Sequence, residues 1–251
     1  MFMSGNTDAS LLEKAAPTVR DNILQKYRND KEEIRKAGLP AGYHQIPSPV
    51  NEQFWGKRAL DLTLGSLAFI LFLVAFPLIA LGIKLSSKGN IIFKQKRTGM
   101  NGHVFTCYKF RTMHSVQKKR NDGEPDITQK GDNRIFTFGS ILRKTNLDEL
   151  PQILNVMKGE MSLIGPRPYP VDECRYWNNT FNDFYYRYMV KPGVTGYAQV
   201  TGFRGGTLDV DHMRKRLDKD LIYIERQSLW MDIKILFLTV KQMVTFNTNA
   251  H

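Results

Sequence analysis

An apolar block from Leu62 to Ile83 constrains this chain more than any other feature, because it contains no charged residue. As a straight helix the block would reach about 33 Å, which is enough to cross the hydrocarbon core of a bilayer. The core helix of a soluble domain normally keeps one polar face, whereas this block is apolar all round. The block therefore predicts a membrane segment.

Two features of the block favour a re-entrant hairpin over a helix that crosses the membrane. Both flanks are basic, with Lys57 and Arg58 before the block and Lys84 and Lys88 after it. A spanning helix keeps its basic excess on the cytosolic side only. Pro77 lies inside the block and removes a helical hydrogen bond. A helix that breaks at Pro77 and turns back would keep both flanks in the cytosol; a kinked spanning helix is the alternative.

A formal charge of +12 indicates an anionic partner for the rest of the chain. Nucleic acid, anionic lipid and phosphorylated small molecules all satisfy this condition, and composition alone does not choose among them. The two cysteines form no CxxC pair, which is typical of reduced thiols in a cytosolic compartment.

Residues 91–113 predict a β-hairpin, because Asn101-Gly102 is a turn signal between two strand-like runs. Alternation along the second run puts Lys109 and Arg111 on one face, about 7 Å apart. Two cations at that separation could grip a diphosphate. The same pattern is also typical of the solvated face of a strand.

Three other segments have helical patterns. Leu11 to Lys36 could form an amphipathic helix, and Ser228 to Val244 predicts an amphipathic helix that packs on the domain or lies on the membrane. An aromatic stripe at helical spacing indicates a core or an interfacial belt, and it consists of Trp177, Phe181, Phe184, Tyr185 and Tyr188.

Two adjacent carboxylates, Asp148 and Glu149, are the strongest candidates for chemistry. A carboxylate can attack a phosphoryl group, and its neighbour can hold a metal ion or act as a base. Arg143 lies close enough along the chain to offset the developing charge. The spacing alone favours a different interpretation, in which Asn146 and Glu149 form a capping box at the start of a helix.

Two rigid loops carry cations. Arg167 stands between Pro166 and Pro168, so its guanidinium is aimed with little loss of entropy, and its fork suits phosphate oxygens. Lys191 opens a Lys-Pro-Gly-Val-Thr-Gly turn with backbone N–H groups that could cradle a phosphate. Each of these loops alone could be an ordinary structural turn.

Together these motifs closely resemble the bacterial sugar transferase family, the monotopic polyprenyl-phosphate phosphoglycosyl transferases. The resemblance covers residues 54–245, and the motifs occur in the order of the family. They are Lys57-Arg58-x-x-Asp61, Tyr108-Lys109-Phe110-Arg111-Thr112-Met113, Leu147-Asp148-Glu149-Leu150-Pro151-Gln152, the stretch from Gly159 to Pro168, the stretch from Lys191 to Gly196, and Asp220-x-x-Tyr223.

The resemblance implies an α+β monotopic membrane protein on the cytosolic face of the bacterial inner membrane. It has a re-entrant helix hairpin, a small β-hairpin and interfacial amphipathic helices. Residues 1–52 would be a polar N-terminal arm, residues 53–88 the re-entrant membrane helix, and residues 89–251 a cytosolic catalytic domain with a C-terminal amphipathic helix. This chain departs from the family pattern at one point: the re-entrant helix of the family often breaks at Ser-Pro, whereas this chain has Phe76-Pro77.

The resemblance also implies the reaction. A sugar-1-phosphate passes from a UDP-sugar to undecaprenyl phosphate through an aspartyl phospho-sugar intermediate, and UMP is released. Asp148 would be the nucleophile, Glu149 would assist the lipid phosphate, and Mg²⁺ would bind near Asp148. The other site residues would bind substrate, and they are Lys109, Arg111, Arg143, Arg167, Lys191 and Asp220.

No nucleic-acid partner is expected for a member of this family, and the sequence leaves the transferred sugar and a homo-oligomer open. The main alternative from another class is a membrane-tethered protein that binds anionic lipid or nucleic acid through its positive charge without catalysis. A catalytically inactive scaffold is a second alternative, which the intact Asp148-Glu149 pair argues against.

Overall fold

The computed structural model describes residues 56–114 and 131–245. The N-terminal arm, with the helix expected from Leu11 to Lys36, lies outside these residues. The described part combines helices with two small two-stranded sheets, which confirms the mixed α and β composition predicted from the sequence.

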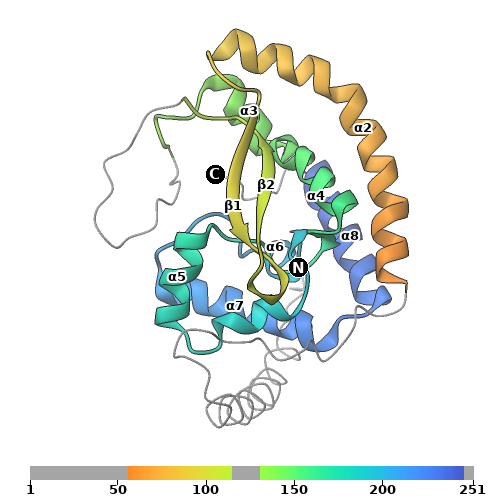
Figure 1. The fold of residues 1–251 in the computed structure, drawn as a ribbon, viewed down its shortest axis with the longest axis vertical. Helices are drawn as coiled ribbons and strands as arrows, with labels where there is room; N and C mark the ends of the chain where they lie inside the picture. Colours follow the sequence, from red (N-terminus) through yellow and green to blue (C-terminus); the bar gives the residue numbers. More distant parts are fainter. Residues whose placement is uncertain (1–55, 115–130, 246–251) are drawn as a thin grey trace, which may run out of the picture.

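The apolar block forms one continuous helix, α2 (Lys57–Ser86), of 30 residues with Pro77 inside it. The helical break predicted at Pro77 is therefore wrong, although Figure 1 shows that α2 curves along the outside of the molecule. Proline can kink a helix without ending it. Packing holds both sides of Pro77: the Phe72 and Phe76 rings before it lie 6.1 and 5.9 Å from the ring of Phe110 in the hairpin, and Ile79 and Ile83 after it are buried.

The two faces of α2 differ in exposure. Its inward face buries Asp61, Gly65, Phe72, Ile79 and Ile83. Its outward face leaves large aliphatic side chains exposed along the whole length, from Leu67 at 58% through Val74 at 70% to Leu85 at 80%. Of the described residues, only α2 is long and apolar enough to cross a membrane.

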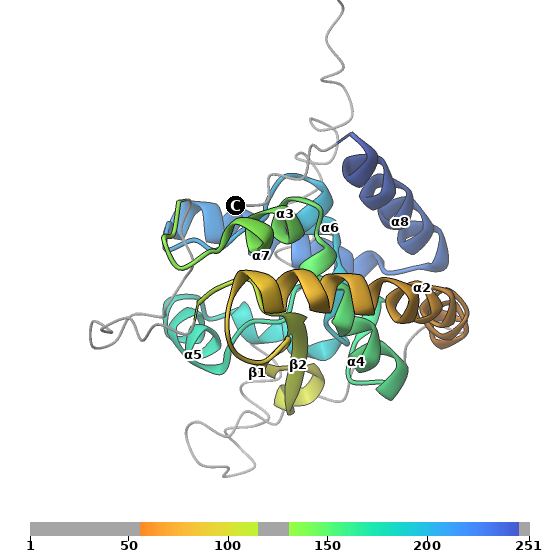
Figure 2. The ribbon, with the colours of Figure 1, turned by 90° about the horizontal axis from the view of Figure 1, so that it is seen from above.

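The predicted β-hairpin is confirmed. Strands β1 (Ile92–Thr98) and β2 (Val104–Phe110) pair antiparallel, with Ile92 opposite Phe110 and Thr98 opposite Val104. A short 3-10 turn, η1 (Met100–Gly102), joins them, and Asn101 has a φ of 56° there. Figure 2 shows the C-terminal half of α2 between this hairpin and α3 (Thr137–Lys144).

The segment that carries Asp148 and Glu149, called the dyad below, follows α3. It runs through the 3-10 helix η2 (Leu147–Gln152) into α4 (Ile153–Lys158). A second sheet then pairs β3 (Ser162–Ile164) in parallel with β4 (Gly193–Thr195). The remaining helices are α5 (Val171–Thr180), η3 (Phe184–Met189), α6 (Tyr197–Val200), α7 (Val210–Arg226) and α8 (Leu229–Val244).

Most of the aromatic stripe belongs to the core. Trp177 and Phe184 are fully buried and Tyr188 is 8% exposed, in a cluster that joins α5, η3 and α7. A first cluster joins α2, the hairpin, α3 and α4, and a third joins β3, α6, α7 and α8. The core interpretation of the stripe is thus the correct one.

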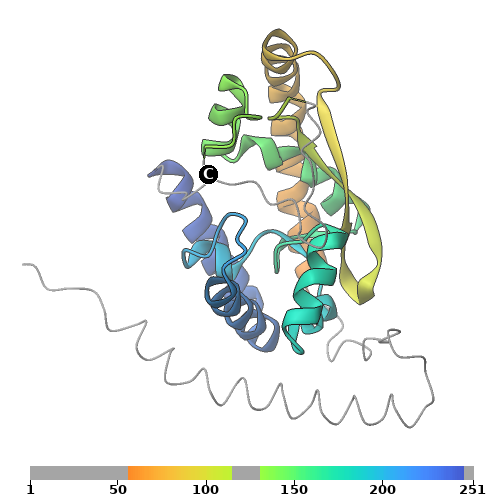
Figure 3. The ribbon, with the colours of Figure 1, turned by 90° about the vertical axis from the view of Figure 1, so that its left-hand side faces the viewer.

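Helix α8 is amphipathic, as predicted, and Ser228 caps its start by accepting a hydrogen bond from Met231 N. Its inner face buries Asp232 and Ile235, while Trp230 is 76% and Phe237 69% exposed. Figure 3 shows α8 and the β-hairpin at opposite edges of the molecule.

Candidate active site

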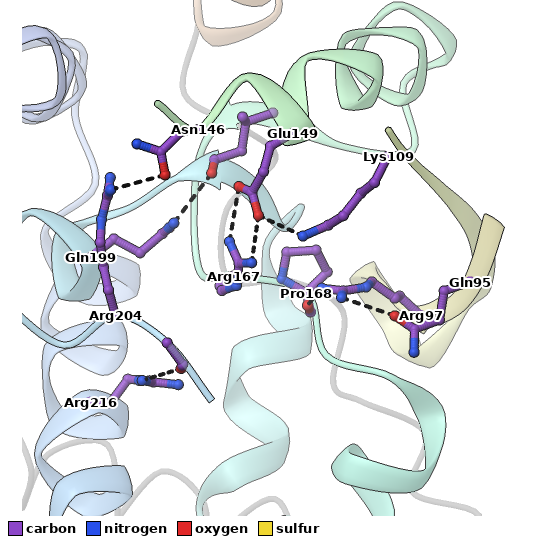
Figure 4. Close-up of polar contacts among 12 residues, drawn as sticks. Gln95, Arg97, Lys109, Asn146, Glu149, Arg167, Pro168, Gln199, Arg204 and Arg216 are labelled. Atoms are coloured by element: carbon purple, nitrogen blue, oxygen red, sulfur yellow. Dashed lines mark hydrogen bonds and ion pairs between the residues drawn. The ribbon is translucent and has the colours of Figure 1, made fainter. Parts of the chain in front are cut away.

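Glu149 is the centre of a cation cluster that three segments build. Its carboxylate accepts from Lys109 Nζ on β2 at 2.6 Å and from Arg167 Nη2, in the loop after β3, at 2.6 Å. Arg167 Nη1 donates to the second oxygen at 3.1 Å, so the arginine binds Glu149 through both arms of its fork (Figure 4). Burial alone would raise the pKa of Glu149, but Arg167 and Lys109 hold it well below its usual value.

The capping-box interpretation of this segment is wrong. Asn146 stands at the N-cap of η2 with a φ of 57° and makes no side-chain cap hydrogen bond. Glu149, the other half of the expected box, turns its side chain to Lys109 and Arg167 instead. The two residues keep only a backbone hydrogen bond, from Glu149 N to Asn146 O.

Asp148 has a different environment from its neighbour. Burial and the adjacent charge of Glu149 raise its pKa to about 6, while Lys109, Arg143 and Arg167 oppose that rise. In the described part of the chain, no hydrogen bond to the Asp148 carboxylate accompanies these charges. The dyad therefore pairs a carboxylate held by cations with one that is available to a substrate or a metal ion.

The Pro-Arg-Pro loop is held from behind by two buried arginines. Arg187 donates to the backbone carbonyl of Arg167 at 2.7 Å, and Arg97 donates to the carbonyl of Pro168. Asp220 binds Arg187 Nε at 2.8 Å, and its own side chain is only 3% exposed. Asp220 is thus placed as a positioning residue behind Arg167 rather than on the substrate side where the sequence put it.

The turn from Lys191 to Gly196 is a packing motif against the Gly165 loop. Gly193 N donates to Pro166 O and Gly165 N to Thr195 O, both at 2.9 Å. A Cβ atom at Gly193 would lie 2.1 Å from Gly165 N, so a side chain has no room there. Gly193 N, an N–H of the turn, is therefore engaged by a backbone carbonyl and is not available to the phosphate cradle that the sequence suggested.

Lys191 and Arg111 are placed apart from the dyad. The charged neighbours of Lys191 are Arg58, Asp61 and Lys57, at the start of α2. Arg111 lies beyond the end of β2, so it does not share a strand face with Lys109. It donates to the carbonyls of Ser87, Lys88 and Asn90 at 2.7, 2.9 and 2.5 Å. The diphosphate grip expected from Lys109 with Arg111 is therefore wrong, because Arg111 holds the end of α2.

Arg143, at the C-terminal end of α3, belongs to the dyad's surroundings as expected. Burial lowers its pKa, and among the charges around it Asp148 opposes that shift most strongly. With Lys109 and Arg167 it adds a third predicted cation to the site.

The sequence missed three residues that support or extend the site: Arg97 and Arg187 behind the Pro-Arg-Pro loop, and Arg204. Arg204 Nη1 lies 3.4 Å from Asn146 Oδ1, two residues before Asp148 (Figure 4). Its flanking glycines, Gly202 and Gly205-Gly206, mark a tight loop and could have drawn attention to it, as the prolines did for Arg167. Arg97 and Arg187 carry no comparable local signal.

A magnesium ion fits this site only as an ion shared with substrate. Among the described residues, no group of three or more His, Cys, Asp or Glu side chains could hold a metal ion. Mg²⁺ is commonly bound by one or two carboxylates together with phosphates and water. The available carboxylate of Asp148 suits that arrangement, whereas Glu149 is already engaged by two cations.

The motif before the apolar block fastens α2 to the body. Lys57 forms a buried ion pair with Asp232 on α8 at 2.5 Å, and Arg58 donates to the carbonyls of Val156 and Met157. Asp61 accepts from Ser162 Oγ at 2.9 Å. The motif therefore anchors the start of α2 to the rest of the protein.

Comparison with known proteins agrees with this geometry. The family model described as bacterial sugar transferase matches residues 52–246. A UDP-glucose:undecaprenyl-phosphate glucose-1-phosphate transferase of Caulobacter vibrioides is 45% identical over 191 residues, which are 75% of this chain and 70% of that protein. The enzyme of the same name from Escherichia coli (strain K12) is 44% identical over 184 residues, 73% of this chain and 39% of that protein.

A UDP-N-acetylgalactosamine-undecaprenyl-phosphate N-acetylgalactosaminephosphotransferase of Aeromonas hydrophila is 38% identical over 200 residues, 80% of this chain and 46% of that protein. The chain thus spans less than half the length of the Escherichia and Aeromonas relatives. The match nevertheless covers the hairpin, the dyad and every loop that surrounds it. This confirms the resemblance read from the motifs: the chain belongs to the bacterial sugar transferase family, a family of transferases.

Proposed function

We propose that this protein transfers a sugar-1-phosphate from a UDP-sugar to undecaprenyl phosphate, giving undecaprenyl-diphosphate-sugar and UMP. The main support for the proposal is that the two carboxylates of the dyad have different surroundings. Glu149 is bound by Lys109 and Arg167, while the Asp148 carboxylate beside it is not engaged by a hydrogen bond in the described residues. A buried carboxylate with a raised pKa is a better nucleophile than a solvated one.

In the first step, an Asp148 oxygen attacks the β-phosphorus of the UDP-sugar. The bond from that phosphorus to the bridging oxygen breaks, and UMP leaves with the electron pair. The enzyme then carries an aspartyl phospho-sugar. In the second step, an oxygen of the lipid phosphate attacks the same phosphorus, and the Asp148 carboxylate is released.

The cations supply most of the catalytic effect in this proposal, because phosphoryl transfer depends on positioning and charge stabilisation. Arg167, Lys109 and Arg143 surround the dyad and would bind the phosphates. Glu149 would keep Arg167 and Lys109 in place. Its low pKa makes it a weak base, and a lipid phosphate that is already ionised does not need a strong one.

When bound, Mg²⁺ would offset the negative charge of the diphosphate. Asp148 would be the residue that holds it.

We further propose that the protein is monotopic, on the cytosolic face of the bacterial inner membrane. The support is that one body binds both ends of α2: Asp232 binds Lys57 at the start, and Arg111 binds Ser87 and Lys88 after the end. A crossing helix would carry its two ends to opposite sides of the bilayer. The exposed apolar faces of α2 and α8 would enter one leaflet, with the bend at Pro77 taking the place of a hairpin.

Glucose is the first sugar to test, since relatives named for UDP-glucose share the higher identities with this chain, and N-acetylgalactosamine is the second. The product would be the lipid-linked sugar that begins assembly of an exopolysaccharide, capsule, O-antigen or glycoprotein glycan.

Intact mass measurement of the purified protein tests the proposal. With Mg²⁺ and UDP-glucose alone, wild type should gain the mass of one hexose phosphate and release UMP, and Asp148→Asn should do neither. UMP release across a panel of UDP-sugars, with and without undecaprenyl phosphate, identifies the sugar. A protein that binds anionic vesicles but gives no adduct and no UMP with any sugar is a binding protein, as in the alternative from another class.

A further inference from the structure

Arg204 is a cation of the site that no sequence motif singled out. It lies in the loop between α6 and α7, and its Nη1 approaches Asn146 Oδ1 at 3.4 Å. Asn146 in turn is the left-handed residue that opens η2, two positions before Asp148. Figure 4 shows Arg204 and Asn146 on one side of Glu149, with Lys109 on the other.

The backbone on both sides of Arg204 is anchored. Phe203 N donates to Ala198 O at 2.9 Å, and the Phe203 ring lies against His212 with the ring centres 5.3 Å apart. Gly205 O accepts from Arg216 Nη2 at 2.7 Å, and Arg216 is 2% exposed. Arg187 holds the backbone carbonyl of Arg167 in the same way. The backbone on both sides of Arg204 is therefore fixed.

The electrostatics around Arg204 favour an anion. Burial lowers its pKa, the positive charge of Arg167 lowers it further, and Glu149 acts in the opposite direction. Two guanidinium groups that interact unfavourably are stabilised when a phosphate binds between them. The buried Asn146 Nδ2 adds a donor that has no hydrogen-bond partner among the described residues.

We propose that Arg204, together with the Asn146 amide, binds a phosphate group of the substrates, and that this group belongs to the diphosphate of the UDP-sugar. The inference rests on the function proposed above. The phosphate of the acceptor lipid could bind the same two residues. The two cases differ in the first step: a site for the UDP-sugar affects formation of the adduct, whereas a site for the lipid phosphate does not.

The first experiment replaces Arg204 by Ala and by Lys, with Arg175→Ala as the control, because Arg175 is an exposed arginine on α5. Titration with UMP in Mg²⁺ buffer should show Kd raised about 10-fold or more in Arg204→Ala and less in Arg204→Lys. Formation of the adduct from UDP-sugar alone should slow to a similar degree, while kcat/KM for undecaprenyl phosphate stays within about 2-fold, because it depends only on the second step. Arg175→Ala should match wild type.

The second experiment separates phosphate binding from a structural role in which Arg204 only supports Asn146. Asn146→Asp keeps a residue type that tolerates positive φ and strengthens the contact with Arg204. A supporting role predicts full activity for this variant. Phosphate binding predicts a loss of about 10-fold or more in kcat/KM, because the new carboxylate competes with phosphate for Arg204. Asn101→Asp is the matched control, since Asn101 is the other described non-glycine residue with positive φ and lies in the exposed hairpin turn.

The outcomes are distinct. Normal UMP binding and adduct formation in Arg204→Ala, with a lowered kcat/KM for undecaprenyl phosphate, would overturn the assignment to the UDP-sugar and place the lipid phosphate there. Full activity of Asn146→Asp would overturn phosphate binding altogether, even if Arg204→Ala fails to fold. Wild-type protein that releases no UMP with any UDP-sugar would refute the proposed function itself, which is a separate result.

Discussion

The adjacent carboxylates of Asp148 and Glu149 have pKa values shifted in opposite directions, because different charged side chains surround them. Glu149 meets Lys109 from β2 and Arg167 from the loop after β3, and both lie within 2.6 Å of one of its oxygens. Asp148 makes no such ion pair among the described residues, and burial together with the negative charge of Glu149 raises its pKa to about 6. Charge partners, more than residue type, decide which carboxylate can attack a phosphorus.

This difference predicts how Asp148→Asn changes stability with pH in metal-free protein. The pKa of Asp148 is higher in the folded protein than its ordinary value of 3.8, so its contribution to stability is full below pH 3.8 and is lost as the pH rises through about 6. Relative to wild type, Asp148→Asn should therefore be more stable at pH 8 than at pH 4.5, by on the order of 1–3 kcal/mol.

Thermal unfolding in nanodiscs with EDTA at the two pH values measures this effect. Adding Mg²⁺ at pH 8 should reduce the advantage of the variant, because the ion stabilises the ionised carboxylate. Equal Tm differences at both pH values would mean that Asp148 is not perturbed.

Arg167→Lys tests the bidentate contact with Glu149. Lysine keeps the charge but can make only one of the two hydrogen bonds, so Glu149 and the phosphate-binding edge of the loop lose their fixed geometry. We expect kcat/KM to fall about 10- to 100-fold with little change in Tm. Arg226→Lys, at the exposed end of α7, is the control. A fully active Arg167→Lys enzyme would remove Arg167 from the catalytic set.

At the scale of elements, buried polar contacts determine how the helices are joined. Lys57 on α2, Tyr223 on α7 and Asp232 on α8 form one network: Lys57 Nζ binds Asp232 Oδ2 at 2.5 Å, and Tyr223 Oη donates to Asp232 Oδ1 at 2.8 Å. Tyr223 comes from the same motif as Asp220, which acts on Arg187. Helix α7 thus supports the candidate active site with one residue and helix α2 with another.

Asp232→Asn should expose the cost of an unpaired charge in this network. The variant keeps an acceptor for Tyr223 but leaves the Lys57 ammonium buried at 2% exposure without its counter-ion. We expect a loss of about 3–5 kcal/mol of unfolding free energy, measured as a drop in Tm. Asp218→Asn removes a more exposed ion pair on α7 and should cost about 1 kcal/mol or less.

A double variant sharpens this test. Lys57→Met with Asp232→Leu removes both charges and should recover much of the Tm lost in Asp232→Asn. If Asp232→Asn unfolds at the wild-type temperature, the network does not stabilise the junction of α2 and α8.

At the scale of the whole molecule, the body of the protein and the apolar helix α2 are one unit. The body holds the start of α2 through Lys57, Arg58 and Asp61, its middle through Phe110, and its end through Arg111. The aliphatic side chains that remain exposed form the outer face of this helix. The body is thus fixed to α2 at the start, in the middle and at the end of the helix.

This arrangement predicts the accessibility of both ends of α2 in cells. Cysteines placed at Glu52 and at Lys88, an exposed position after the helix, should both be protected from a membrane-impermeant thiol reagent in intact cells and both react after lysis. The native Cys107 and Cys174 are 1% and 4% exposed, so background labelling should be low. Reaction of only one site in intact cells would mean that α2 crosses the membrane.

Local patterns in the sequence determined the elements. Asn101-Gly102 between two alternating runs specifies the hairpin, the uncharged block specifies α2, and the periodicity after Ser228 specifies α8. Each of these depends on neighbours within a few residues, where turn chemistry and hydrophobic spacing are sufficient. The ordered motifs also determined the family.

Only the tertiary structure decided which charged residues meet. Arg111 and Asp220 look like ligands in the sequence, yet one holds the end of α2 and the other holds Arg187. Arg204 looks like a loop residue, yet it meets Asn146, two residues before Asp148, across 58 positions of the chain. Such contacts depend on how helices and strands pack, and on which buried charge needs which partner. No local periodicity encodes that pairing. For the same reason the sequence predicted a break at Pro77, whereas packing of α2 on a distant strand before the proline and burial of Ile79 and Ile83 after it accompany a continuous helix.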